Sequence, residues 1–295
     1  MTAIRVAACA KINLNLKILG RRSDGFHELE SVLQTISLHD TLQIEPGGDR
    51  LDLSVTATDD RIPGNETNLV WRAAAALGAG GPDRGLRIHL QKGVPSGAGL
   101  GGGSSDSAAT LLTVRRIWAG QDDDGLHRQA ERLGTDVPFF LVGGTALVTG
   151  RGTVVHPLAD QTGYELLVVC PGMPLPTAGV YAQLQEPLTP AGKIDSMTRF
   201  VMASDFGVEA GVRAGNDLEP HAVRLCPAIG EIKERLLRSG ATAAAMTGSG
   251  SAVFGVFRVA GSRDGAADEM IRCGWAAYRC APVGRREYRR RLGLA

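Results

Sequence analysis

The sequence has few of the features that place a protein outside the cell or on a membrane. Its five cysteines, at positions 9, 170, 226, 273 and 280, are odd in number, scattered, and include no Cys-x-x-Cys pair. This pattern gives no sign of a disulfide framework or a zinc site, so we expect reduced cysteines that pack as small hydrophobic residues. No uncharged apolar segment approaches the roughly 18 residues of a membrane span, and the first residues lack a secretion signal. We therefore expect a cytoplasmic protein.

Net charge is nearly absent as well, because 32 lysines and arginines face 31 acidic residues, a formal charge of +1. A balanced composition gives no general attraction to nucleic acid or to an anionic membrane, and neither is expected as a partner. The arginines between positions 285 and 291 are locally basic, and we interpret them as a solvated helical tail. The expected partner is a small molecule, and the expected assembly is a monomer or a weak homodimer.

What the sequence does contain is enough apolar material for a large core, with 43% hydrophobic residues among 295. This length and composition predict a globular protein of two domains. Five of the fourteen prolines fall between positions 171 and 190, which indicates a long irregular loop. We place the domain boundary before that loop, with residues 1–160 as the N-terminal domain and 161–295 as the C-terminal domain. The expected class is α+β.

Hydrophobic periodicity predicts the individual elements. The clearest strand covers residues 12–18, where apolar and polar residues alternate strictly. Asn68 can cap a helix over about 68–78, and another helix runs from Ser104 or Ser105 to Trp118. Further strands are expected at 32–44, 51–56, 86–90, 145–149, 165–170, 243–246, 252–258 and 276–280, and further helices at about 125–133, 220–225, 228–239 and 264–273.

Residues 93–112, GVPSGAGLGGGSSDSAATLL, hold six glycines just ahead of a helix start. Gly97 and Gly102 have the spacing of a Walker loop, but Gly103 stands where its lysine should be. The same segment fits the Gly-x-Gly-x-x-Gly dinucleotide fingerprint, yet the acid that this fold needs ~20 residues later falls in a loop between two helices. A tight turn alone would need only one or two glycines.

Converging backbone N–H groups at a helix N-terminus suit an anion, so we favour a phosphate cradle over these alternatives. Lys92, just before it, is a candidate extra cation. A second stretch, MTGSGSAVFG at 246–255, is by itself typical of a hairpin turn, and it gains interest only as a partner of the first. The candidate residues of this phosphate cradle are Pro95, Ser96, Gly97, Ala98, Gly99, Leu100, Gly101, Gly102, Gly103, Ser104 and Ser105.

Phosphoryl transfer also needs charge neutralisation and a group that orients the attacking hydroxyl, commonly an aspartate. Lys11, Asn13 and Asn15 share one face of the first strand, which is explained either by solvent exposure or by a row of groups facing a ligand. Asp136, in GTDVPFF, is either a helix cap followed by a first-turn proline or a catalytic base held at a helix end. Residue chemistry leaves both questions open.

The roles of four further residues stay open. His27 follows a turn and is a lone histidine, a residue type that is most often structural. Asn216 and Asp217 read as a turn or a cap. Tyr181 is either core or a ring that stacks on a base.

Taken together, these segments resemble the superfamily of galactokinase, homoserine kinase, mevalonate kinase and phosphomevalonate kinase. PSGAGLGGGSS matches its ATP loop. Within it, ACAKINLNLKILGRRSDGFHELES, GTDVPFF, GNDLEP and TGSGSAVFG resemble the branch that acts on a cytidine diphosphate-linked methylerythritol in the non-mevalonate isoprenoid pathway. The resemblance covers nearly the whole chain in the same order.

The resemblance implies an N-terminal domain like domain 2 of ribosomal protein S5, a ferredoxin-like C-terminal domain, and an active site in the cleft between them. It also implies ATP and Mg²⁺, with Lys11 and Asp136 as the catalytic pair. The positions that it matches to substrate contacts are Asn13, Phe26, His27, Thr177 and Tyr181. A serine at the helix start, Ser104 or Ser105, could reach the ion, but no acidic metal ligand is evident.

This chain departs from the family pattern where Phe26, Thr135 and Thr247 replace tyrosine, alanine and serine. The loss of the phenol removes one hydrogen bond and keeps the stacking face. The alternatives are a sibling small-molecule kinase of the homoserine or mevalonate type, a nucleotide-binding module without catalysis, and a nicotinamide-dependent oxidoreductase.

Overall fold

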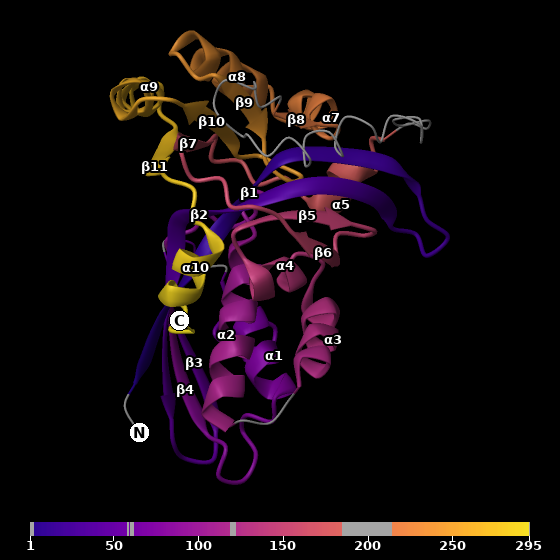
Figure 1. Cartoon of the computed structure of the whole chain (residues 1–295), viewed down its shortest axis with the longest axis vertical. Coiled ribbons are helices and arrows are strands. Elements are labelled where there is room, and N and C mark those ends of the chain that lie inside the picture. Colours follow the sequence, from indigo (N-terminus) through magenta and orange to yellow (C-terminus); the bar gives the residue numbers. More distant parts are fainter. Residues whose placement is uncertain (1–2, 58, 60–61, 119–121, 185–213, 295) are drawn as a thin grey trace.

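The computed structural model describes residues 3–57, 59, 62–118, 122–184 and 214–294, and these residues form two β-sheets with helices packed on each (Figure 1). The first sheet has seven strands, with the order β3-β4-β2-β1-β8 and with β5 and β6 continuing from β2. Its strands are β1 (Ile4–Arg21), β2 (His27–Pro46), β3 (Leu51–Thr56), β4 (Leu86–Gln91), β5 (Thr145–Thr149), β6 (Val154–Pro157) and β8 (Gly215–Asn216).

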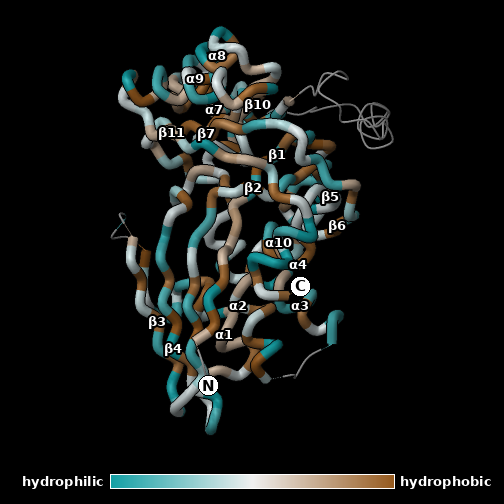
Figure 2. The backbone as a smooth tube through the Cα atoms, turned by 60° about the vertical axis from the view of Figure 1, so that its left-hand side comes forward, coloured by the Kyte–Doolittle hydropathy of each residue, from teal (hydrophilic) through white to brown (hydrophobic). Residues whose placement is uncertain are grey.

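Four helices cover one face of this sheet. Figure 2 shows the two layers edge-on, with β3 and β4 on one side and α1 and α2 on the other. The helices are α1 (Leu69–Ala76), α2 (Gly102–Trp118), α3 (Asp123–Leu133) and α4 (Val137–Val142). As predicted, the Asn68 side chain accepts the N–H of Val70 and caps α1. The helix α2 begins two residues before the predicted serines, at Gly102.

The second sheet is antiparallel, with the order β11-β7-β10-β9. Apart from two short helices that precede the first long one, its described elements follow one another as strand, helix, strand, strand, helix, strand, which is the ferredoxin-like arrangement that was expected. The elements of this half are β7 (Glu165–Cys170), α5 (Thr177–Tyr181), α7 (Glu219–Leu225), α8 (Ala228–Arg238), β9 (Ala243–Met246), β10 (Val253–Phe257), α9 (Ala260–Arg272) and β11 (Ala276–Cys280).

The strand β1 joins the two halves because it contributes to three hydrophobic cores. Val6 packs between the first sheet and its helices. Ile12 and Leu14 pack against Leu166 and Phe254 of the second sheet, and Ile18 packs with the helices of that sheet. The middle of β1 is therefore fixed from both sides, and Lys11 and Asn13 lie there.

The predicted strands and helices are present, but several bounds differ: β1 begins eight residues before the predicted 12–18, and β2 begins five residues before the predicted 32–44. The short, largely exposed β6 was not predicted, because four residues give almost no periodic signal. The helix α9 begins four residues earlier than expected, at Ala260. The proline-rich loop contains the one-turn helix α5, and its positions 185–190 lie outside the described residues.

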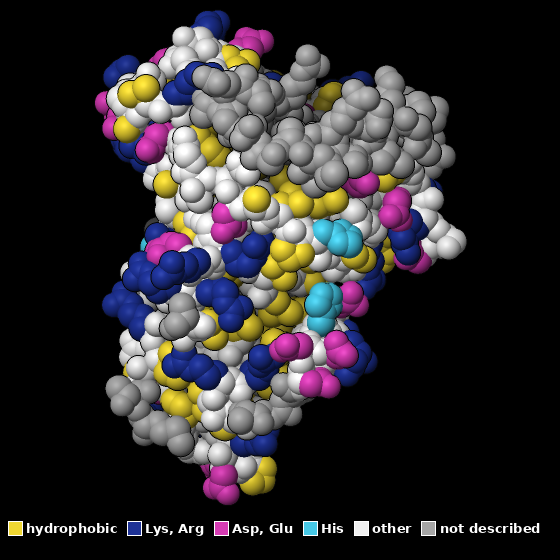
Figure 3. Space-filling model, viewed as in Figure 1, with side chains coloured by type: hydrophobic (Ala, Val, Ile, Leu, Met, Phe, Trp, Pro, Cys, Tyr) yellow, Lys and Arg dark blue, Asp and Glu magenta, His cyan; other side chains and the backbone are white. Residues whose placement is uncertain are grey.

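The C-terminal arginines form the predicted helix, α10 (Arg285–Arg291), and Arg286, Arg289 and Arg290 are exposed, but the helix is packed on the core and is not a free tail. Figure 3 shows Lys and Arg side chains gathered over this helix. On its other side, Tyr288 is fully buried in the core of the first sheet, and its hydroxyl donates to the Phe140 carbonyl at 2.5 Å. Because arginines dominate this segment, its sequence pattern did not indicate that the Tyr288 ring would anchor the helix.

Candidate active site

A cavity of about 900 Å³ brings together segments that are far apart in the sequence. Its wall includes the middle of β1, the turn between β1 and β2, the glycine loop at 95–101, the start of α4, the helix α5 and the loop after β9. The predicted site residues on this wall are Lys11, Asn13, Phe26, His27, Gly97, Gly99, Gly101, Asp136, Thr177 and Tyr181. The cavity therefore collects the candidate catalytic and substrate residues in one place.

The polar side chains of β1 are not exposed to solvent, since Lys11 is 3% and Asn13 5% exposed. The ammonium of Lys11 donates to Asn13 Oδ1 at 2.6 Å, which places both side chains on one face. Asn13 Nδ2 in turn donates to the Ser31 hydroxyl at 2.7 Å. Burying a lysine without a carboxylate nearby would be costly, and the nearest carboxylate is that of Asp136, 3.5 Å from the ammonium.

Asp136 stands at the N-cap position of α4, with a proline in the first turn, but its side chain makes no capping hydrogen bond. The carboxylate is 35% exposed and faces the cavity. Of the two interpretations that the sequence left open, the structural cap is therefore not realised. The local sequence positions the carboxylate at a helix start and leaves its oxygens available to a ligand.

In the first glycine loop, glycines with positive φ alternate with buried residues. Gly97, Gly99 and Gly101 have φ of +66°, +79° and +69°, a region that side chains other than glycine rarely adopt. The residues between them, Ala98 and Leu100, are buried in the core between the sheets. The loop is thus anchored through alternate side chains while its backbone faces outward, and a second hollow of about 610 Å³ follows its outer side from Pro95 to Ser104.

The loop between β9 and β10 is both a hairpin connection and a partner of the first loop. The Ala252 N–H donates to the Ala98 carbonyl at 3.2 Å, and the Thr247 hydroxyl lies 3.4 Å from the Gly99 carbonyl. A Cβ placed at Gly99 would be only 2.2 Å from the Thr247 carbonyl oxygen. The two loops therefore touch through backbone, with no room for a side chain at that point.

Sequence reasoning did not single out Asn216, although the structure gives it a clear task. Its amide donates to the carbonyls of Met246 and Gly248, each at 2.8 Å, while its oxygen accepts the Leu218 N–H. It thereby holds the second loop against β1. The only sequence signal was the GNDLEP segment, which looks like an ordinary turn.

Aromatic rings lie at the other end of the cavity. The rings of His27 and Tyr181 are 5.0 Å apart and tilted by 40°. Burial, with a smaller contribution from the charge of Asp136, raises the pKa of Tyr181 to about 12, so its hydroxyl stays neutral. Phe26 is 48% exposed at the rim, and the Thr177 and Ser249 hydroxyls lie 2.9 Å apart. Two half-enclosed rings beside polar groups suit a planar heterocycle.

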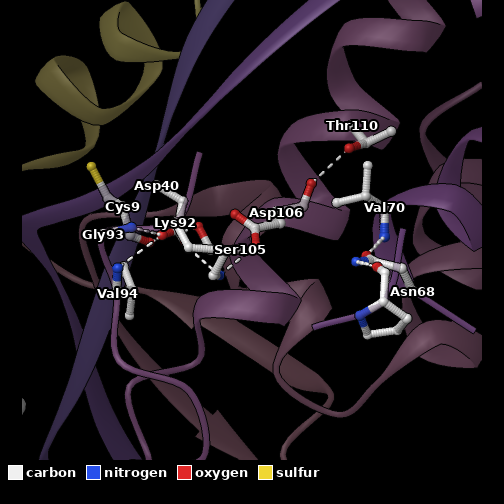
Figure 4. A network of polar contacts seen from close by, with 11 residues as sticks. Cys9, Asp40, Asn68, Val70, Lys92, Gly93, Val94, Ser105, Asp106 and Thr110 are labelled. Atoms are coloured by element: carbon white, nitrogen blue, oxygen red, sulfur yellow. Dashed lines mark hydrogen bonds and ion pairs between the residues drawn. The ribbon is translucent and has the colours of Figure 1, made fainter. Parts of the chain in front are cut away.

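Lys92 does not serve as a free cation beside the loop, contrary to expectation. Figure 4 shows its ammonium held between the carboxylates of Asp40 and Asp106. The other oxygen of Asp40 accepts the N–H groups of Gly93 and Val94 at 2.6 and 2.8 Å. Burial raises the pKa of Asp106 well above its usual range, against the attraction of Lys92. The three side chains tie the entry of the glycine loop to the first turns of α2.

The two serines at the helix start also differ. The Ser105 hydroxyl is fully buried and donates to the Cys9 carbonyl at 2.6 Å, so it is engaged inside the protein. Ser104 lines the outer hollow of the loop. Within the described part of the chain, no group of three or more His, Cys, Asp or Glu side chains could hold a metal ion, and no helix is long and apolar enough to cross a membrane.

Comparison with known proteins places these features in a family. The family models for the N-terminal and C-terminal domains of GHMP kinases match residues 68–144 and 203–277. The 4-diphosphocytidyl-2-C-methyl-D-erythritol kinase of Pelotomaculum thermopropionicum is 44% identical over 86% of this chain and 88% of that protein. The enzyme of the same name from Geobacter metallireducens is 40% identical over 92% and 95%.

Solved structures give the same result. A crystal structure of 4-(cytidine 5′-diphospho)-2C-methyl-D-erythritol kinase superimposes with a TM-score of 0.79 at 34% identity and covers 95% of this chain and 100% of that chain. Homoserine kinase from Cytophaga hutchinsonii, at 19% identity and a TM-score of 0.75 over 97% and 96%, shares the fold. The chain therefore belongs to the GHMP kinases, which use ATP, and within them to the family of 4-diphosphocytidyl-2-C-methyl-D-erythritol kinases.

Proposed function

We propose that this protein transfers the γ-phosphate of ATP to the 2-hydroxyl of 4-diphosphocytidyl-2-C-methyl-D-erythritol, a step of the non-mevalonate isoprenoid pathway. One observation carries the proposal: the Lys11–Asp136 pair lies in a cavity that has the glycine loop on one side and the His27–Tyr181 rings on the other. A phosphate donor and an acceptor that carries a nucleobase can thus meet at the Asp136 carboxylate.

In this mechanism Asp136 accepts the proton of the attacking hydroxyl while the new oxygen–phosphorus bond forms. The bond from the γ-phosphorus to the bridging oxygen breaks, and ADP leaves with the electron pair. Lys11, 3.5 Å away, is paired with this carboxylate and offsets charge on the transferring phosphoryl group. Asn13 holds the ammonium in place through their 2.6 Å hydrogen bond and lines the same wall.

The nucleotide is assigned to the glycine loop. Of residues 95–105, those from Ser96 to Ser104 carry the backbone N–H groups for this role, because Pro95 has none and that of Ser105 donates to the Gly101 carbonyl. The N-terminus of α2 adds a partial positive charge that favours a phosphate. Mg²⁺, which offsets phosphate charge when bound, would arrive on ATP and keep several waters as ligands. Of the two helix-start serines, Ser104 is the one that remains able to reach it, because the Ser105 hydroxyl is buried against Cys9.

The acceptor is assigned to the aromatic end. His27 is proposed to form a hydrogen bond with cytosine, Tyr181 and Phe26 to stack on it, and Thr177 to complete the pocket. Homoserine and mevalonate carry no base, so a sibling kinase would have no use for these rings. We also propose that residues 1–160 and 161–295 act as the two domains, in a reduced, cytoplasmic enzyme that is a monomer or a weak homodimer.

The test is direct. The purified chain is incubated with ATP, Mg²⁺ and the cytidyl substrate, and phosphorus NMR is expected to show ADP and a new phosphomonoester resonance. Homoserine and mevalonate serve as control acceptors and should give no product. A folded chain that binds ATP but phosphorylates a control acceptor, and not the cytidyl substrate, would favour the sibling-kinase alternative.

A further inference from the structure

The turn between β5 and β6 carries an arginine, Arg151, that lines the 900 Å³ cavity. Its guanidinium carbon lies 5.6 Å from the centre of the Phe26 ring. The turn is fixed, because the Gly150 carbonyl accepts the N–H of Leu29 in β2 at 2.8 Å. At the adjoining Gly152, an added Cβ would lie 3.9 Å from that of Thr135, the residue before Asp136. Arg151 therefore lies between the reacting end of the cavity and its aromatic end.

The charge of Arg151 is not committed elsewhere in the described residues. The structure records no ion pair or side-chain hydrogen bond for it there, only the ring contact with Phe26. Its charge does help to lower the pKa of Asp24, but that carboxylate is already paired with Arg22 and accepts the Phe26 N–H. An arginine in a ligand cavity with five donors and one ring contact is available to an anion.

The other cations on the cavity wall are placed differently. Lys11 is bonded to Asn13 and paired with Asp136. Arg21 pairs in register with His27 at the far end of β1, which puts it at the aromatic end. Arg151 is thus the cation of this wall that stands between the base-binding rings and the catalytic carboxylate.

On the proposed function, a substrate with its base at the rings and its hydroxyl at Asp136 must place its diphosphate between them. We infer that Arg151 binds this diphosphate and so determines the preference for a nucleoside diphosphate-linked acceptor. A guanidinium fork matches two phosphate oxygens at once, and the Phe26 ring keeps the fork in the cavity.

The surroundings add to this role. Beside the cavity, a hollow of about 550 Å³ shares Phe26, Thr135 and Arg151 with it and is lined also by Arg128, Glu131 and Arg132 of α3. Three arginines face one glutamate there, so the outer rim is net positive. Such a rim raises the local concentration of an anionic substrate before it docks.

The experiment compares CDP with cytidine as ligands in calorimetric titrations, with a non-hydrolysable ATP analogue present in excess to fill the nucleotide site. Arg151→Met keeps the aliphatic stem and removes the charge, and Arg151→Lys restores a charge without the fork. Arg132→Met is the matched control for the general attraction of the rim, because it removes a charge that lines the outer hollow and not the cavity. We expect Arg151→Met to weaken CDP binding about 10-fold, the lower end for a lost charged hydrogen bond at a partly exposed site, and cytidine less than about 2-fold.

In the same series, Arg151→Lys should recover part of the CDP affinity, and Arg132→Met should change it less than about 2-fold. Equal weakening of CDP and cytidine would show that Arg151 acts through the ring of Phe26, and unchanged CDP binding would show that it does not contact phosphate; either result overturns the inference. The titrations need no turnover, so the two proposals fail separately: absent phosphorylation by the wild-type chain refutes the function, and absent CDP discrimination refutes the role of Arg151.

Discussion

Replacing Asp136 by asparagine tests the catalytic assignment with little change to the fold. The carboxylate makes no capping hydrogen bond and is 35% exposed, so the helix α4 does not depend on it. Its ion pair with Lys11, at 3.5 Å, involves an ammonium that is only 3% exposed, so losing the carboxylate charge leaves that ammonium with Asn13 as its remaining hydrogen-bond partner and costs about 1–3 kcal/mol. Asparagine keeps the shape, and the free energy of unfolding should therefore fall by no more than this amount.

The effect on the reaction should be much larger. A positioned general base contributes about 10²–10⁴ in rate, which at 1.36 kcal/mol per factor of ten is about 2.7–5.4 kcal/mol of transition-state stabilisation. Asparagine cannot accept the proton of the hydroxyl. The kcat of Asp136→Asn should thus fall at least ~10²-fold, while the KM for ATP stays within about 2-fold, because the glycine loop is untouched.

The assay is coupled ADP release, with ATP affinity measured separately by titration. Asp122→Ala is a suitable control: Asp122 caps α3 by accepting the Gly125 N–H at 2.7 Å, so its loss should cost about 1 kcal/mol of stability without lowering kcat. If Asp136→Asn instead retains kcat, or if its main defect is in ATP binding, then the carboxylate is not the base and the mechanism is wrong.

Three further changes probe the loops, the ring and the buried charges. Gly99→Ala places a Cβ 2.2 Å from the Thr247 carbonyl at φ +79°, so ATP affinity should drop at least ~10-fold in a titration; an unaffected affinity would refute the contact between the loops. Tyr181→Leu should raise the KM for the cytidyl substrate about 10-fold and leave that for ATP within 2-fold, whereas equal changes would place the ring elsewhere. Because the folded state holds the Asp106 proton above the unfolded pKa of 3.8, wild-type stability falls as pH rises through and beyond that value. Melting temperatures of Asp106→Asn relative to wild type should therefore rise from pH 4 to pH 8, and a flat difference would contradict the burial of that carboxyl.

Much of the fold was predictable because long periodic segments carry strong local signals. The alternation around Ile12 identified the strand and put Lys11 and Asn13 on one face. It could not tell a solvated face from a buried one, because the polar row would look the same in both cases. Only contacts with remote residues, such as Ser31, Asp136 and Thr247, show that Lys11 and Asn13 are buried.

The errors have a common physical origin. Lys92 and Ser105 carry groups that suit a phosphate or a metal ion, and the sequence around them is rich in such groups. What commits them elsewhere is a partner distant in sequence: Asp40 lies 52 residues from Lys92, and Cys9 lies 96 residues from Ser105. Local patterns contain no information on pairs so far apart.

The position of Lys11 depends on both glycine loops. A Cβ at Gly101 of the first loop would be 3.1 Å from Lys11 Cγ, and one at Gly248 of the second would be 3.3 Å from its ammonium. Glycine at both positions therefore lets the backbones of two loops approach one side chain. Because β1 packs against the second sheet and the loops are hydrogen bonded to each other, folding itself sets how closely the two loops approach Lys11. What a ligand can still adjust is the exposed rim around Phe26, which is where selection between acceptors should occur.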